Sequence, residues 1–148
     1  MHPTAVRLQE RLRERGLAIS VEVLDDSART VVEAAAAVGV EPARILKSLV
    51  FLADGDPVMV LCAGDRRVGA KRLGLRPATA DEARAATGYA IGGIPPLGHD
   101  RQLDTLIDAS LRRFDTIWAA AGTPHAVFEI STSALIDAIP GARVVDVA

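Results

Sequence analysis

The sequence predicts an α/β protein of the α+β type, in which peripheral helices surround a mixed, curved, barrel-like sheet. Runs with strand character outnumber runs with helical character. Most neighbouring strands also lack the long helical crossover of a βαβ unit between them. Of the 148 residues, 49% are apolar and only 3% aromatic, which is enough for one core of aliphatic side chains. Because this length is typical of one domain, we expect residues 1–148 to form a single unit.

Two helices are expected in the N-terminal third. Apolar residues at positions i, i+3 and i+7 predict an amphipathic first helix that ends near Gly16, and these residues are Ala5, Leu8 and Leu12. An alanine-rich helix is predicted over residues 31–38. Ser27 and Thr30 are its candidate N-caps, and Gly39 is expected to end it.

A β-hairpin gives the clearest strand pattern. Its two apolar runs cover residues 45–53 and 58–63, and a turn from Asp54 to Pro57 separates them. The last helix is expected to end at Ile139. The other predicted strands cover residues 18–24, 105–108, 116–121, 126–130 and 143–147.

A helix followed by a shaped loop is expected in the middle of the chain. Thr79 and Glu82 form a capping-box pattern that predicts a helix over residues 80–86. The loop over residues 92–99 has the sequence Gly-Gly-Ile-Pro-Pro-Leu-Gly-His, which no regular element tolerates. Such a rim of rigid backbone N–H groups suits the binding of a carbonyl oxygen or the rejection of a side chain by size. A purely structural connection is the alternative, and the loop lacks the pattern of a phosphate loop.

Composition and charge exclude several classes of protein. No apolar run approaches the roughly 20 residues of a membrane span, and the charged start of the chain lacks the apolar stretch of a secretory signal. The single cysteine, Cys62, has apolar neighbours, so we expect a buried thiol rather than a reactive one. These features favour a cytoplasmic protein without a membrane partner. No oligomeric state is predicted.

Basic residues gather between Asp65 and Arg76, although the net charge of the chain is −2. A local basic patch of this kind can contact phosphates on a mildly acidic protein. A solvated loop is the alternative, and charge alone leaves both interpretations open. The five basic residues are Arg66, Arg67, Lys71, Arg72 and Arg76.

Lys47 is unusual because strand alternation places it in an apolar row with Ile45, Leu49 and Phe51. Burying an unpaired ammonium is costly. Lys47 therefore either extends to the sheet edge or faces a cleft that supplies an anion, and the residues alone favour the first interpretation.

No metal site or catalytic triad is indicated. His99 and His125 lie beside Gly or Pro in loops, without a second ligand at metal-binding spacing. Ser110, His99 and Asp108 supply the residue types of a triad, but no nucleophile-elbow pattern supports one.

Four segments, in this order, resemble the YbaK/prolyl-tRNA-synthetase-associated editing domains over roughly residues 19–141. The strand over residues 45–51 resembles the one that carries their characteristic lysine, here Lys47. Residues 87–98 resemble their threonine-glycine-tyrosine segment and GxxxP loop, with Gly92 and Pro96 as the motif residues. The strand and turn over residues 106–111 and the glycine-bearing turn over residues 120–125 complete the resemblance. Relatives usually place a lysine- and leucine-rich helix after the segment matching residues 65–68, and this helix looks deleted here.

The resemblance implies an editing-domain fold and hydrolysis, in trans, of the ester bond of mischarged aminoacyl-tRNA. The implied substrates are tRNA for proline carrying cysteine or alanine, with cysteine weakly favoured, and prolyl-tRNA synthetase is a further implied partner. The chemistry is substrate-assisted and needs no cofactor or metal. Lys47 is implied to contact the phosphate or terminal adenosine of the acceptor end, and the glycine loop to line the aminoacyl pocket. The implied catalytic residues are Lys47, Gly92 and Gly93. The implied substrate-binding residues are Ile94, Pro95, Pro96, Gly98, His99, Asp108, Gly122, Thr123 and His125.

Two other functions stay open. The first is a non-catalytic module of the same fold that binds an aminoacyl-tRNA or a synthetase. The second is a hydrolase for a small ester or nucleotide-like metabolite.

Overall fold

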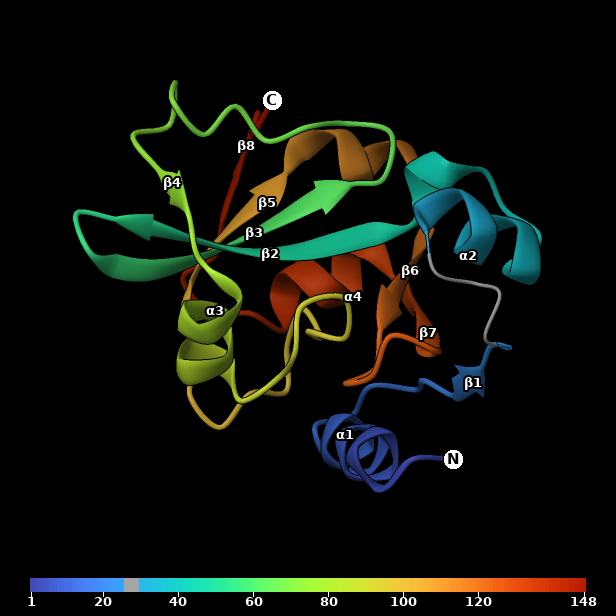
Figure 1. The fold of residues 1–148 in the computed structure, drawn as a ribbon. Helices are drawn as coiled ribbons and strands as arrows, with labels where there is room; N and C mark the ends of the chain where they lie inside the picture. The colour runs from blue at the N-terminus through green and yellow to red at the C-terminus, as the bar shows by residue number, and fades with distance from the viewer. Residues whose placement is uncertain (26–29) are drawn as a thin grey trace.

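A computed structural model describes residues 1–25 and 30–148 of the chain (Figure 1). The helices are α1 (Pro3–Glu14), α2 (Val31–Val38), α3 (Ala80–Thr87) and α4 (Thr132–Asp137), with 3-10 turns η1 (Pro42–Arg44) and η2 (Ala109–Arg113). The strands are β1 (Val21–Val23), β2 (Leu46–Ala53), β3 (Asp56–Ala63), β4 (Arg76–Pro77), β5 (Asp104–Asp108), β6 (Thr116–Ala120), β7 (Ala126–Ser131) and β8 (Arg143–Val145). No helix in this described part is long and apolar enough to span a membrane.

The described strands form two sheets, one of five strands and one of three. The larger has the order β4-β2-β3-β5-β8 and the smaller the order β1-β7-β6. The larger sheet is mixed, as predicted, because β4, β2 and β3 pair antiparallel whereas β3, β5 and β8 pair parallel.

The sheets are not closed into a barrel, so the barrel-like part of the prediction is not confirmed. They meet at a single bridge between Ile45 and Trp118. Beyond this bridge β2 and β6 separate, and side chains of both strands line a cavity instead of continuing the ladder. Figure 1 shows the two sheets diverging in this region.

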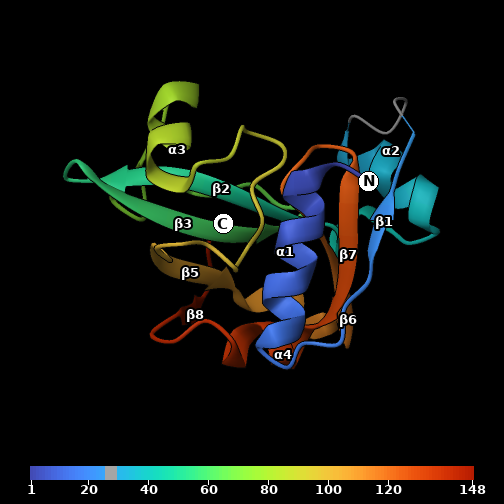
Figure 2. The same ribbon diagram turned by 90° about the horizontal axis from the view of Figure 1, so that it is seen from below.

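The main core lies between the two sheets and is covered by α1 and α4. Leu8 and Leu12 of α1 are 2% and 0% exposed, in agreement with the predicted amphipathic face. Figure 2 shows α1 lying alongside β7. A smaller cluster, which includes Phe51, Val60 and Cys62, covers the opposite face of the larger sheet. Cys62 is fully buried, as predicted.

The hairpin turn is shorter than predicted. Ala53 pairs with Asp56, so Asp54 and Gly55 alone make the turn. Both have positive φ angles, 50° and 86°, which is the backbone that Asp-Gly favours in a two-residue hairpin loop. β3 therefore begins two residues before the predicted start.

The predicted helices are confirmed where the structure describes them. Thr30 caps α2 through the N–H of Glu33, and Thr79 and Glu82 form the predicted capping box. Ser27, the other candidate cap, lies outside the described residues. The first and last strands are shorter than predicted, and β4 was missed because two residues carry no periodic pattern.

Gly64, at the end of β3, lets three elements approach closely. A Cβ atom there would overlap the carbonyl oxygen of Pro42 and lie 2.8 Å from that of Ile45. Because these oxygens belong to the backbone, no side-chain rotation would relieve the overlap.

We expect Gly64→Ala to lower the free energy of unfolding by about 1–3 kcal/mol, as overpacking usually does. Chemical denaturation measures this change. Gly74→Ala is the control, because Gly74 has a positive φ of 69° but no atom within 4 Å of its Cβ position. The control substitution should lower the free energy of unfolding by only about 1 kcal/mol, which is the penalty for alanine in a left-handed backbone conformation. Equal losses in both variants would contradict the close approach.

Candidate functional site

A cavity of about 350 Å³ lies along β2, between α2, α3, the glycine loop and the β6–β7 turn. Its walls are mainly aliphatic. Among the described residues that line it, Lys47 is the only ionisable side chain. Thr30, Ser48 and Trp118 add the remaining polar side chains. The site therefore combines one cation with an apolar enclosure.

The cavity exists because the outer edge of β2 is paired only at its two ends. Ile45 bridges to β6, and Phe51 and Leu52 pair with β4. Between them, Val50 accepts a hydrogen bond of 3.1 Å from the N–H of Ala78, so its backbone groups point away from β3. By the two-residue period of a strand, the backbone groups of Ser48 also point outward, toward the open part of the edge.

Lys47 is half-buried on the wall of this cavity. Its Nζ donates a hydrogen bond of 2.5 Å to the backbone oxygen of Arg66. An ammonium has three N–H donors, and the described contacts use one of them. The ammonium is thus held by a neutral carbonyl of the segment that follows β3, and no described carboxylate forms a salt bridge with it.

The glycine loop packs against the β6–β7 turn. A Cβ atom at Gly93 would lie 2.8 Å from Cα of Thr123 and 3.0 Å from the oxygen of Gly122. Gly92 has a φ of 92° and faces the Pro124 ring. Only glycine allows both the close contact and the left-handed backbone here.

The structure brings only part of the predicted site set to the cavity. Lys47, Gly92 and Ile94 line it, and Gly93 contacts the turn behind it. Gly122, Thr123 and His125 flank Pro124, which does line it. These four neighbours are not lining residues themselves, and neither are the remaining members of the set, which are Pro95, Pro96, Gly98, His99 and Asp108.

His99 lies under the loop instead of in the cavity. It is 4% exposed, its Nε2 lies 2.7 Å from the oxygen of Pro95, and its ring packs edge-on against Tyr89. Burial lowers the pKa of His99 and outweighs the backbone oxygens of Pro95 and Thr87, which act in the opposite direction. The ring therefore acts as a buried support for the loop.

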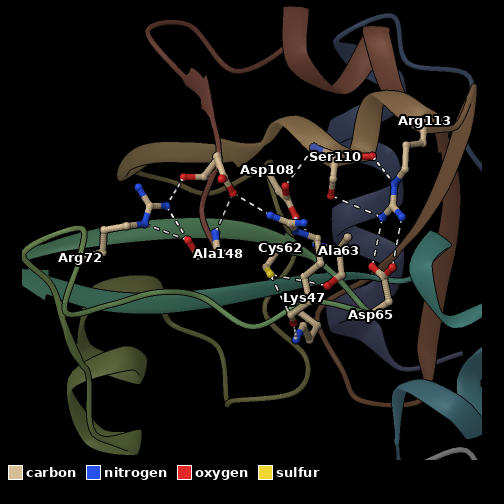
Figure 3. A network of polar contacts seen from close by, with 11 residues as sticks. Lys47, Cys62, Ala63, Asp65, Arg72, Asp108, Ser110, Arg113 and Ala148 are labelled. Atoms are coloured by element: carbon tan, nitrogen blue, oxygen red, sulfur yellow. Dashed lines mark hydrogen bonds and ion pairs between the residues drawn. The ribbon is translucent and has the colours of Figure 1, made fainter.

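Asp108 is fully buried at the end of β5 (Figure 3). Its carboxylate accepts hydrogen bonds from the N–H groups of Ala63, at 3.1 Å, and Ser110, at 2.9 Å. Arg66 Nε lies 3.4 Å from the same carboxylate. These contacts hold the end of β3 against η2.

Most of the basic segment is engaged in contacts within the protein. Arg66 pairs with Asp108 and Asp146, and Arg76 pairs with Glu82. Arg72 donates to backbone oxygens of Asp146 and Ala148. The described residues provide no hydrogen-bond or ion-pair partner for Arg67 and Lys71, which are both exposed. The segment between β3 and β4 forms turns and contains no helix.

The sequence motifs missed two parts of the cavity wall. One is Trp118 on β6, which belongs to no motif. The other is the face of α2 that presents Val31, Ala34 and Val38 to the cavity. Their i, i+3, i+7 spacing was the available signal for that face. No group of three or more His, Cys, Asp or Glu side chains in the described ranges is arranged to hold a metal ion.

Comparisons with known proteins agree on one family. The model of the aminoacyl-tRNA editing domain matches residues 25–138. An uncharacterised Bacillus subtilis protein, YwhH, is 33% identical over 122 residues, which are 78% of each protein. A proline–tRNA ligase of Ligilactobacillus salivarius is 35% identical over 94 residues, which are 59% of this chain but only 16% of the ligase. The crystal structure of a candidate trans-editing enzyme for prolyl-tRNA synthetase is 40% identical with a TM-score of 0.89, and the match covers 99% of this chain and 97% of that one.

The lowered pKa of His99 predicts a pH dependence of stability. As the pH falls below about 6.5, the unfolded chain binds a proton at this histidine that the folded protein disfavours. The free energy of unfolding should therefore decrease with falling pH more steeply in the wild type than in His99→Gln. Urea denaturation at several pH values on both sides of this point measures the difference. Parallel curves for the two proteins would show that burial does not penalise the charged ring.

Proposed function

The chain belongs to the aminoacyl-tRNA editing domain family, and on this basis we propose that it hydrolyses mischarged aminoacyl-tRNA in trans. The proposed substrate is tRNA for proline carrying cysteine or alanine, and the proposed setting is the cytoplasm. The observation that carries the proposal is the single cation, Lys47, in an otherwise apolar cavity beside the glycine loop. The volume of about 350 Å³ is within the range of small-molecule sites.

Lys47 is proposed to bind the anionic acceptor end of the tRNA. Its described hydrogen-bond partner is a neutral carbonyl, so no described carboxylate competes with a bound anion. A phosphate or a developing oxyanion would be stabilised more strongly beside this apolar wall than in water.

The proposed chemistry is substrate-assisted ester hydrolysis. Water adds to the ester carbonyl and the terminal ribose hydroxyl leaves. With cysteine, the substrate thiol can instead attack its own carbonyl, which releases the ribose hydroxyl and leaves a thiolactone that water then opens. The cavity wall supports this proposal because its described residues include no His, Cys, Asp or Glu that would act as a base or nucleophile. Positioning by the loop backbone and charge stabilisation by Lys47 are then the contributions of the protein.

The aliphatic wall is proposed to favour a small amino acid. Val50, Ala83 and Ala119 are among the lining residues and offer apolar contacts. An apolar pocket discriminates by only about 1–3 kcal/mol per methylene, so cysteine and alanine both remain in the proposal.

A non-catalytic aminoacyl-tRNA-binding module is the second candidate. This function is favoured by the turns between β3 and β4, because other members of the family usually carry a helix there. The same absence of a side-chain base at the described cavity wall is also compatible with binding alone.

The first experiment is a deacylation assay. Purified protein is incubated with tRNA for proline charged with cysteine, alanine, serine or proline, and ester loss is compared with a protein-free control. Selective loss of a non-cognate amino acid supports the proposal, whereas binding without loss supports the binding module.

We expect Lys47→Met to lower the deacylation rate by about 10²–10³-fold, because it removes the charge but keeps a long apolar side chain. Circular dichroism and thermal unfolding check that the variant is folded. A folded variant that deacylates at the wild-type rate would rule out a catalytic role for this lysine.

The two unpaired cations of the basic segment should contribute to tRNA affinity. We expect the Arg67→Ala/Lys71→Ala variant to bind tRNA more weakly and to reduce the slope of log affinity against log salt by about 1.4–1.8, as two lost phosphate contacts predict. Filter binding over a range of salt concentrations measures this slope. Arg76→Ala is the matched control, because Arg76 is already paired with Glu82. A double variant with the slope of this control would exclude phosphate contacts by Arg67 and Lys71.

A further inference from the structure

Lys47, Cys62 and Asp108 form a row across three strands of the larger sheet. Lys47 pairs with Cys62 between β2 and β3. Leu61 pairs with Ile107 between β3 and β5, so Asp108 lies opposite Cys62 one residue further along. Adjacent strands are about 4.8 Å apart, and paired residues point to the same face. Lys47 and Asp108 therefore share a face at about two strand spacings, a span that the two side chains can bridge together. Figure 3 shows Cys62 between them.

The Cys62 thiol lies between the two charged residues on this face. Its Sγ lies 3.6 Å from the backbone oxygen of Arg66, the atom that also accepts the hydrogen bond from Lys47. Burial raises the pKa of Cys62, the charges of Lys47 and Arg66 lower it, and the charges of Asp108 and Asp65 raise it. Lys47 and Asp108 form no salt bridge with each other in the described contacts.

The side chain of Arg66, rather than that of Lys47, is the cationic partner of Asp108. Its Nε lies 3.4 Å from the Asp108 carboxylate, and its Nη2 lies 2.6 Å from Asp146. At the same time the backbone oxygen of Arg66 accepts the hydrogen bond from Lys47. One residue therefore neutralises the buried carboxylate and holds the lysine.

We propose that Arg66 is a positioning residue that keeps the Lys47 ammonium away from Asp108 and directs it to the cavity. This inference rests on the proposed role of Lys47 in binding and hydrolysis. A fully buried carboxylate that loses its cationic partner is destabilised unless another cation pairs with it. Lys47 is a flexible cation on the same face, and Arg143 of β8 is another by the strand register. Because Lys47 is already bound to the backbone oxygen of residue 66, removing the Arg66 guanidinium lets Asp108 capture the lysine.

The test uses charge deletion and its rescue. Arg66→Met removes the guanidinium but keeps the backbone carbonyl, and Arg66→Lys keeps a cation. Arg66→Met/Asp108→Asn also removes the carboxylate that would capture Lys47. Arg76→Met is the matched control for loss of an arginine that pairs elsewhere, with Glu82.

We expect Arg66→Met to lower kcat/KM for deacylation by about ten-fold to a hundred-fold, the effect of one misplaced charged hydrogen bond. Arg66→Lys should retain most activity, and the double variant should recover most of the loss even though it lacks two buried contacts. A purely structural role would instead make the double variant at least as inactive as Arg66→Met. Thermal unfolding of every variant separates loss of fold from loss of positioning.

A crystal structure of Arg66→Met tests the positioning without any activity measurement. The expected result is Lys47 Nζ within hydrogen-bond distance of the Asp108 carboxylate. Lys47 remaining on the backbone oxygen of residue 66, or absence of rescue in the double variant, would overturn the inference. If Lys47→Met deacylates at the wild-type rate while the lysine does move in Arg66→Met, the proposed role of Lys47 fails but the positioning by Arg66 stands. If the wild-type protein does not deacylate any charged tRNA, the proposed function fails, and the crystal structure still tests the positioning.

Discussion

Incomplete pairing of the outer edge of β2 is the constraint on which the site depends. The strand is joined to β6 at Ile45 and to β4 at Phe51 and Leu52, and the edge between them is open up to the hydrogen bond that Val50 accepts. A closed barrel would have filled this edge with a continuous ladder and left no space beside it. The divergence of the two sheets instead creates a cavity walled by both sheets, α2 and the glycine loop. The same divergence exposes the wall that carries Lys47.

Charge on the larger sheet is arranged so that Lys47 has no carboxylate partner among the described residues. The buried Asp108 has two backbone donors and one guanidinium, which satisfies the carboxylate without the lysine. Lys47 is then left with a carbonyl partner, which fixes its position without cancelling its charge. A low-polarity wall makes such a charge more effective toward an anion than it would be in water. This arrangement gives a physical reason for a basic residue inside an apolar row.

Close backbone packing sets the opposite wall of the site. Gly93 contacts Thr123, and Gly98 lies where a Cβ atom would come within 2.7 Å of Leu8 in α1. The loop is therefore fixed both to the β6–β7 turn and to the first helix, with buried His99 beneath it. A rigid loop suits the positioning role that an editing domain without a side-chain base requires. The shape of the pocket thus depends on elements from both ends of the chain.

Elements with local signals could be predicted from the amino-acid sequence. The amphipathic α1, the capping box at Thr79 and the Asp54-Gly55 hairpin follow from spacing, side-chain capping and backbone preference within a few residues. The ordered motifs also identified Lys47 and the glycine loop, which the structure brings to one cavity. Three features follow only from tertiary contacts. The sheets stay open, α2 lines the cavity, and Arg66 forms ion pairs with Asp108 and Asp146. These features depend on contacts between residues more than 40 positions apart, such as Ala63 with Asp108, which no local period encodes. For the same reason, composition could not distinguish the arginines that have partners within the protein from Arg67 and Lys71, which have none among the described residues.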